Sequence, residues 1–320
     1  MRRFLAFTLV TLAMVAVVGI AGAGEKKYKL ALVLKSLTNP AIKDIADGAQ
    51  AAADKYGVDL TILSSQGFSA LEEQINQVED VMRRQVDLIG IQAVDSKGVI
   101  PVIEDANAKN VPIISVDTGA DGGKVLSYIS TDNTEAGHAA GAWLVRQVGE
   151  GKVAMIEGTP GSQQGRERRD GFHAALGEQS KVQLVSSITA NFERVKGMEV
   201  MEDILTANPD LKGVFCANDE MALGALETLR QRNAIGKVIV IGMNGAPDAI
   251  LATYKNEIQG TVLQYTSFMG ETFVRMAVEY LDSKGTATFP PFYNTGYGIA
   301  DTKFVQKLFS SFGLVPELKK

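Results

Sequence analysis

The sequence predicts an α/β protein made of two lobes, each a doubly wound parallel sheet. Short apolar segments rich in β-branched residues alternate with helical segments along most of the chain, which is typical of parallel sheets covered on both faces. The alternation restarts after residue 129. About 300 residues remain once the apolar N-terminus is set aside, which is more than one hydrophobic core usually supports. These observations favour two lobes of similar size.

The first half of the chain contains the elements of one lobe. In its second helix, Leu71, Ile75, Val78 and Met82 recur at helical spacing and would form one apolar face. The predicted strands are 29–34, 59–63, 88–91, 112–116 and 125–129, and the predicted helices are 41–56, 69–84 and 98–109.

The second half repeats the pattern. The predicted strands are 152–156, 182–188, 213–216 and 237–241, and the predicted helices are 133–148, 162–177, 194–207 and 219–232. In the tail 302–320, Phe304, Val305, Leu308 and Phe309 also recur at helical spacing. The tail is therefore predicted to be an amphipathic helix that packs on the protein.

The strand–helix junction within 213–231 is the most informative segment. The apolar strand ends in Asn218 and Asp219, and a helix-forming run follows at once. Ligands of open α/β sheets lie outside the carboxyl ends of the strands. We expect Asp219 to cap the helix, which would leave Asn218 to face the crevice. The alternative is that both residues serve only the turn and the cap.

The first 23 residues have the pattern of a signal peptide. Arg2 and Arg3 precede an apolar run without charges, and small residues ending at Ala23 follow it. A membrane anchor is the alternative, but the run from residue 5 to residue 20 is shorter than the ~20 residues of a usual span. The sequence thus predicts export and cleavage near Ala23.

Composition narrows the function classes. The formal net charge is −5, and it becomes −7 once Arg2 and Arg3 are removed, because no acidic residue leaves with them. A mildly acidic surface argues against a nucleic-acid partner. Cys216 is the only cysteine, so no internal disulfide can form, and its apolar strand predicts a buried thiol.

The usual signals of an enzyme or a metal site are weak. The first strand is followed by LKSLTNP, which lacks a glycine fingerprint for a dinucleotide. The segment 158–162 could bind an anion at a helix start, but a simple turn is favoured. His138 and His173 have no ligand-spaced partners. We predict no catalysis, no cofactor and no metal.

Polar residues gather where the predicted strands end. Planar amide, carboxylate and guanidinium groups, together with an aromatic ring, are what sugar recognition requires. Each residue also has a structural alternative, such as a helix start for Asn39, a turn for Asp117 or a solvated charge run for Arg166. The candidates are Lys35, Asn39, Gln92, Asp117, Arg166, Phe192, Asn218, Asn244 and Gln264.

The chain resembles the ribose-binding and related type I periplasmic sugar-binding proteins from about residue 29 to residue 287. The segments that carry the resemblance are ALVLKSLTNP (31–40), DGAQAAADKYG (47–57), VPIISVDT (111–118), STDN (130–133), GRERRDGF (165–172), NFERVKGMEVM (191–201) and the 218–226 segment. The resemblance implies two lobes joined by a three-strand hinge, with crossings near Thr131, Tyr265 and Asn294. The lobes would then be 24–131 plus 266–294 and 132–265 plus 295–320.

The resemblance also implies which residues bind the ligand. Gln92 stands where the ribose binders have an asparagine. Arg166 and Asp117 are expected to face the cleft from different lobes and to contact the ligand. The positions that coincide with ligand contacts of the ribose binders are Asn39, Asp117, Arg166, Phe192, Asn218 and Gln264.

Departures from the family pattern concern the identity of the ligand. Ala41 and Ile42 replace two phenylalanines, and Lys35 replaces a serine. Thr118 stands where the family has an arginine, and Met243-Asn244 replaces a Phe-Asp pair. With fewer aromatic faces, the protein is expected to bind ribose poorly. An acyclic polyol, another small sugar or a sugar acid fits about as well.

The function that the resemblance implies is a solute-binding protein of a sugar ABC importer. Such a protein closes over a small sugar or polyol and presents it to a membrane permease, and we expect this one to be a monomer. The alternatives are a binder of a sugar acid or another small polar solute, and a carbohydrate sensor that presents its ligand to a chemoreceptor. A periplasmic enzyme would need a paired acid and base, and Asp117 alone does not supply one.

Overall fold

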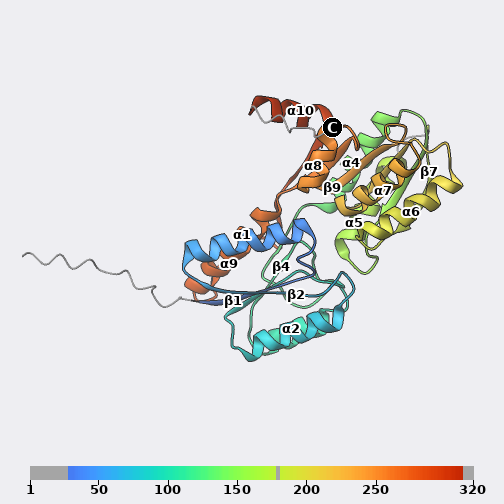
Figure 1. Cartoon of the computed structure of the whole chain (residues 1–320). Coiled ribbons are helices and arrows are strands. Elements are labelled where there is room, and N and C mark those ends of the chain that lie inside the picture. Colours follow the sequence, from blue (N-terminus) through green and yellow to red (C-terminus); the bar gives the residue numbers. More distant parts are fainter. Residues whose placement is uncertain (1–27, 178–180, 313–320) are drawn as a thin grey trace, which may run out of the picture.

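The computed structural model describes residues 28–177 and 181–312, which form two α/β lobes (Figure 1). The predicted signal peptide and the end of the predicted tail helix lie outside these residues. The first lobe has one parallel sheet in the order β11-β5-β4-β3-β1-β2. Its strands are β1 (Lys29–Leu34), β2 (Asp59–Ser64), β3 (Leu88–Ile91), β4 (Ile113–Val116), β5 (Tyr128–Ser130) and β11 (Phe292–Asn294).

Helices cover both faces of this sheet because its strands are apolar on both sides. The helices are α1 (Pro40–Tyr56), α2 (Leu71–Arg83), α3 (Ile100–Ala108) and α9 (Thr266–Asp282). In β1, Leu30, Leu32 and Leu34 belong to the core beneath α1 and α9, whereas Ala31 and Val33 belong to the core beneath α2 and α3. This is because successive side chains of a strand point to opposite faces.

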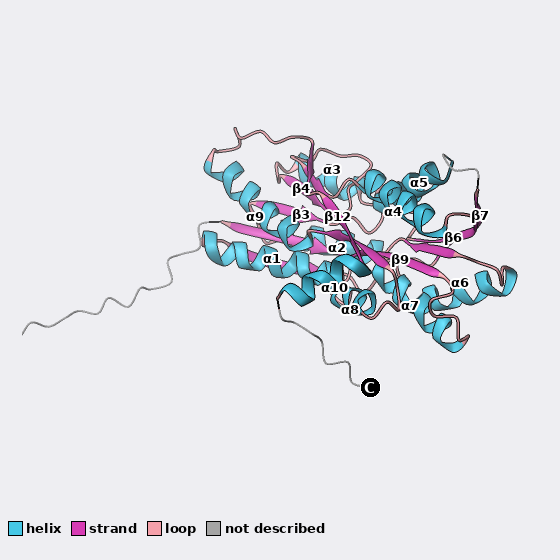
Figure 2. Cartoon of the chain, turned by 90° about the horizontal axis from the view of Figure 1, so that it is seen from above, coloured by secondary structure: helices cyan, strands magenta, loops and turns pink. Residues whose placement is uncertain are grey.

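The second lobe has a sheet in the order β12-β10-β9-β8-β6-β7, in which only β12 is antiparallel to its neighbour. Its strands are β6 (Gly151–Glu157), β7 (Val182–Thr189), β8 (Gly213–Cys216), β9 (Ile239–Asn244), β10 (Gly260–Gln264) and β12 (Tyr297–Asp301). Its helices are α4 (Asn133–Val148), α5 (Gln163–Gly177), α6 (Arg194–Ala207), α7 (Asp219–Gln231), α8 (Pro247–Tyr254) and α10 (Thr302–Ser311). Figure 2 shows helices on both sides of the strands. The buried thiol of Cys216 belongs to this core.

The chain passes between the lobes between β5 and α4, between β10 and α9, and between β11 and β12. Two of these connections are bonded to each other. The Thr295 N–H donates to the carbonyl of Ser130 at 2.9 Å, and the Thr131 hydroxyl donates to the carbonyl of Gly296 at 3.1 Å. The lobes are therefore joined through adjacent connecting segments.

The α/β fold class and its two doubly wound lobes are confirmed, and the corrections concern element ends. The predicted strand 125–129 is observed at 128–130, and the predicted strand 237–241 begins at Ile239 and extends to Asn244. The tail helix is observed at 302–311. Within the described part of the chain, no helix combines the length and the apolar character that a membrane span needs.

The helices α1 and α9 of the first lobe are packed closely against each other. Helices α1 and α9 lie backbone to backbone: a Cβ on Gly48 would lie 2.1 Å from the carbonyl oxygen of Ser267, and one on Gly270 would lie 2.0 Å from that of Ile45. Asp44 of α1 also accepts bonds from the Thr266 hydroxyl and the Ser267 N–H, at 2.5 and 2.9 Å. This packing holds the start of α9 against α1.

Candidate functional site

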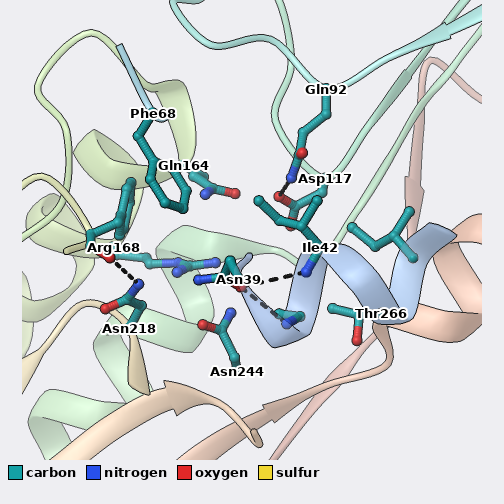
Figure 3. Close-up of a pocket in the computed structure, with 13 residues that line it drawn as sticks. Asn39, Ile42, Phe68, Gln92, Asp117, Gln164, Arg168, Asn218, Asn244 and Thr266 are labelled. Atoms are coloured by element: carbon teal, nitrogen blue, oxygen red, sulfur yellow. Dashed lines mark hydrogen bonds between the residues drawn. The ribbon is translucent and has the colours of Figure 1, made fainter. Parts of the chain in front are cut away.

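A pocket lies between the lobes, at the carboxyl ends of strands from both sheets (Figure 3). Asn39, Gln92 and Asp117 follow β1, β3 and β4, while Asn218 follows β8 and Asn244 ends β9. This is the crevice in which open α/β sheets bind ligands. The lining residues are Asn39, Ala41, Ile42, Ile45, Phe68, Gln92, Asp117, Gln164, Arg168, Phe192, Asn218, Asn244 and Thr266.

Asp117 is the buried carboxylate of the first-lobe wall. Its Oδ2 accepts a bond from Nε2 of Gln92 at 2.6 Å and a longer one from the Thr118 hydroxyl at 3.4 Å. With its amide oriented to donate, Gln164 of the second lobe places Nε2 2.9 Å from the same oxygen. Gln92 also accepts the N–H of Lys35 at 3.0 Å, so the carboxylate is fixed to the end of β1 as well.

The backbone at Asp117 is strained. Its φ is +60°, and the N–H of Thr118 reaches back to the carbonyl of Val116 at 2.7 Å, which makes a γ-turn. The Asp117 carbonyl is held by the hydroxyls of Tyr128 and Ser130, both at 2.9 Å. Such conformations persist where the surroundings over-determine them, and they cluster at ligand sites.

Arg168 of α5 is the cation of the second-lobe wall, and it is 1% exposed. Its guanidinium donates to Oδ1 of Asn133, to the carbonyl of Ala217 and to Oε1 of Gln264, at 2.9, 2.7 and 2.9 Å. A guanidinium carries five N–H groups, so these bonds leave two for other acceptors. Burial lowers the pKa of Arg168, and Asp117 opposes that shift.

The pocket has one aromatic side chain from each lobe. The rings of Phe68 and Phe192 lie 5.7 Å apart at an angle of 47°, and the guanidinium of Arg168 lies 5.9 Å from the Phe192 ring. Phe192 has a φ of +65°, and its carbonyl accepts a bond from Nδ2 of Asn218 at 3.0 Å. The bond from Asn218 thus holds the backbone of Phe192 at the second-lobe wall.

The expected capping role of Asp219 is wrong, because Asn218 caps α7. Oδ1 of Asn218 accepts the N–H of Met221 at 2.9 Å. Asp219 is buried inside the lobe and accepts bonds from the Ala246 N–H and the Thr261 hydroxyl, both at 2.7 Å. Burial raises the pKa of Asp219 to about 6.

Lys35 lies behind the pocket wall and is 1% exposed. Its Nζ donates to the Thr118 hydroxyl at 2.8 Å and to the hydroxyl of Ser162, across the lobe boundary, at 3.4 Å. Burial lowers its pKa to about 8, and Asp117 opposes the shift whereas Arg168 adds to it. The lysine is therefore a buried cation that is linked to Asp117 through a threonine hydroxyl.

The structure brings together most, but not all, of the predicted site residues. Lys35, Thr118, Met243 and Gln264 are buried behind the pocket and do not line it. Gln264 holds both Arg168 and Asn244, the latter at 2.7 Å. The predicted residues that line the pocket are Asn39, Ile42, Gln92, Asp117, Phe192, Asn218 and Asn244.

Arg166 is not among the lining residues, which corrects the expectation that it faces the cleft. It pairs with Asp121 of the first lobe at 2.7 Å, and Arg168 takes the place expected for it. The register of α5 gives the reason. Its buried positions include Gln164, Arg168 and Phe172, a spacing of four that marks one helix face, and Arg166 lies on another face.

Sequence reasoning also missed Phe68, Gln164 and Thr266. Phe68 lies in the connection between β2 and α2, where no periodic pattern distinguishes it. Gln164 shares the buried face of α5 with Arg168, so the helical period could have identified both. Within residues 28–177 and 181–312, no group of three or more His, Cys, Asp or Glu side chains could hold a metal.

The fold and the pocket together define a two-lobed binding protein that encloses a small ligand between its lobes. Residues 30–285 match the periplasmic binding protein domain, and the chain belongs to that family. It is 38% identical to the ribose import binding protein of Escherichia coli over 82% of this chain and 88% of that protein. It is 36% identical to the ribose import binding protein of Bacillus subtilis over 81% and 84% of the two chains.

A solved structure shows the same architecture. An ABC transporter periplasmic solute-binding protein from Actinobacillus succinogenes, with bound D-allose, superposes with a TM-score of 0.83 at 29% identity. The match covers 88% of this chain and 100% of that chain. The resemblance to periplasmic sugar-binding proteins is thus confirmed.

The position of Lys35 predicts a dependence of stability on pH. Between its folded pKa of about 8 and its ordinary value of 10.5, the unfolded chain holds a proton that the folded chain has lost. The free energy of unfolding of the wild type, relative to Lys35→Met, should therefore rise with pH across this window, by at most about 3 kcal/mol. Urea denaturation of both proteins at several pH values checks this, and parallel curves would contradict it.

Proposed function

We propose that this protein is the periplasmic solute-binding protein of an ABC importer, and that it binds a small sugar or polyol without transforming it. The observation that carries the proposal is the pocket between the lobes. It combines the Arg168 guanidinium, the Asp117 carboxylate, several amides and two aromatic rings. Hydroxyl groups both donate and accept hydrogen bonds, so a polyhydroxylated solute matches a wall that offers both.

The hydrogen-bonding capacity left at the pocket supports such a ligand. Oδ1 of Asn39 caps α1, which leaves the Nδ2 of Asn39 as a donor. Nδ2 of Asn244 donates to Gln264, which leaves Oδ1 of Asn244 as an acceptor. Buried Nε2 of Gln264 lies beside this network without a hydrogen-bond partner. With the two remaining N–H groups of Arg168, Nδ2 of Asn39 and Oδ1 of Asn244 supply directed contacts for hydroxyls.

The pocket favours a ligand that needs little ring stacking. Ala41 and Ile42 line the pocket and contribute no aromatic face. Poor binding of ribose therefore stays our prediction, although the Escherichia coli and Bacillus subtilis relatives are ribose import binding proteins by name. A sugar acid is the second candidate, because the buried cations Lys35 and Arg168 both lie near the single pocket carboxylate of Asp117.

The partner in this proposal is the membrane permease of a sugar importer, which receives the closed, loaded protein. We propose that the protein acts as a monomer, since one chain supplies both walls of the pocket. A chemoreceptor that recognises the same closed form is a further candidate partner. Differential affinity of the ligand for the closed form would drive the change in conformation.

A ligand screen tests the proposal. Thermal unfolding of the purified protein is measured with ribose, allose, glycerol, four- and five-carbon polyols, and sugar acids. A ligand at 100 times its Kd should stabilise the folded protein by roughly 2.7 kcal/mol. We expect a polyol, another small sugar or a sugar acid to outperform ribose. A leading response to ribose would overturn the specificity, and no response to any of these solutes would contradict the function.

Replacing Asp117 with asparagine tests the pocket wall. Asparagine tolerates a positive φ and keeps the shape of the side chain while removing its charge. Affinity for the best solute of the screen should fall roughly 10- to 100-fold in calorimetry, because charge-assisted bonds to hydroxyls are lost. Asp105→Asn, on the exposed surface of α3, is the matched control and should bind normally. Wild-type affinity in Asp117→Asn would remove this carboxylate from the site.

Fractionation of cells tests the predicted export of the protein. The protein should be recovered from the periplasmic fraction in a form that begins near Gly24, because the pattern of residues 1–23 is that of a cleaved signal peptide. N-terminal sequencing of that fraction reads the cleavage site directly. Recovery of the uncleaved chain in the membrane fraction would show that the segment acts as an anchor.

A further inference from the structure

The segment from Gly161 to Arg166 joins the two lobes beside the pocket. The Ser96 N–H, after β3, donates to the carbonyl of Gly161 at 3.0 Å, and the Gln163 N–H donates back to the Ser96 hydroxyl at 2.9 Å. Ser96, Gly161 and Gln163 do not line the pocket. They therefore connect the lobes without facing the space that a ligand would fill.

An ion pair continues this contact. Nη2 of Arg166 donates to both carboxylate oxygens of Asp121, at 3.0 and 2.7 Å. Nη1 of Arg166 is held by the carbonyls of Pro160 and Gly161 in its own lobe, at 3.3 and 3.0 Å. On the other side, the Asp121 N–H donates to the carbonyl of Ser96 at 2.8 Å. Both charged groups are thus oriented by their own lobe, which reduces the entropy lost when they meet.

The close approach depends on a glycine. A Cβ on Gly161 would lie 2.1 Å from Oδ2 of Asp95 in the first lobe. Asp95 cannot turn away freely, because its Oδ1 accepts the N–H groups of Lys97 and Gly98 at 3.0 and 2.7 Å. Gly161 does not have a positive φ, so alanine suits its own backbone. Any larger residue there would oppose the approach of the lobes without straining its own lobe.

We propose that this closure contact, formed by Ser96 and Asp121 of the first lobe with Gly161, Gln163 and Arg166 of the second, sets ligand affinity by stabilising the closed conformation. The proposal rests on the binding function proposed above. Gln164 and Asp117 line the pocket from opposite lobes. Gln164 lies between Gly161 and Arg166 in the chain, and Asp117 lies just before Asp121. A motion that separates the pocket walls therefore separates Arg166 from Asp121 as well.

The energetic role of the closure contact differs from that of a pocket residue. Its bonds are made between protein groups and exist only when the lobes meet, so they shift the equilibrium between open and closed forms. An apparent dissociation constant scales inversely with the fraction of the binding-competent form. Loss of the contact should thus weaken every ligand by the same factor, whereas loss of a pocket residue changes the ranking of ligands.

The test uses Asp121→Asn, Arg166→Gln and Gly161→Ala in the full-length mature protein. The control for the ion pair is Arg194→Gln, because Arg194 makes an equivalent two-bond pair with Glu220 within one lobe, with both bonds at 3.0 Å. The control for the steric variant is Gly177→Ala, since a Cβ at Gly177 would meet nothing within 4 Å. Lobe separation is measured without ligand by energy transfer between one dye on each lobe, and affinities are measured by calorimetry.

We expect the ion-pair variants to weaken every bound solute by about three- to fivefold. Gly161→Ala should weaken them by about tenfold or more. In all three variants the ligand ranking should stay unchanged, the dissociation rate should rise, and the unliganded protein should shift toward wider lobe separation. The two controls should behave as the wild type does.

Two results would overturn the closure contact. One is unchanged lobe separation in all three variants, and the other is an altered ranking of ligands in the ion-pair variants. The energy-transfer measurement needs no ligand, so it tests the contact even if the solute screen fails. If the variants shift the lobe separation but no solute of the screen binds, only the proposed function is rejected. If solutes bind normally and the variants cause no shift, only the closure contact is rejected.

Discussion

The buried guanidinium of Arg168 is the interaction on which the second-lobe wall depends. Its bonds reach Asn133 at the start of α4, Ala217 after β8 and Gln264 at the end of β10. Asn133 and Gln264 flank two of the connections between the lobes. A buried charge that lost these partners would destabilise the folded protein. The pocket wall and the connecting segments must therefore keep the same positions relative to each other.

The pocket concentrates backbone strain on residues that a ligand would meet. Asp117, Phe192 and Asn244 all have positive φ values, of 60°, 65° and 136°. Side-chain and backbone bonds from neighbouring strand ends hold the first two, and the Gln264 amide holds the third. The strain is compatible with a rigid arrangement, because hydrogen bonds from neighbouring residues hold all three. A pre-organised wall loses less entropy when a ligand binds.

The sequence predicted the fold well because strand and helix patterns alternate with a clear change of period. It also predicted that polar residues meet at the strand ends, since parallel strands of one sheet end at one edge. It did not predict the direction of each side chain. Lys35 and Gln264 occupy the expected strand ends, yet they point into the protein because Thr118, Ser162 and Arg168 supply partners there. Among the arginines of the run 166–169, only the register of α5 decides which one reaches the pocket.

The single cysteine has a consequence for how the chain tolerates an oxidising compartment. Cys216 ends β8 with no exposed surface, and burial raises the pKa of its thiol. Oxidants and disulfides react with the thiolate, so the native protein offers them almost none. Mixed disulfides and covalent dimers would form only from chains whose second lobe has opened. The rate at which a thiol reagent modifies this residue therefore reports the unfolding of that lobe, with no engineered probe.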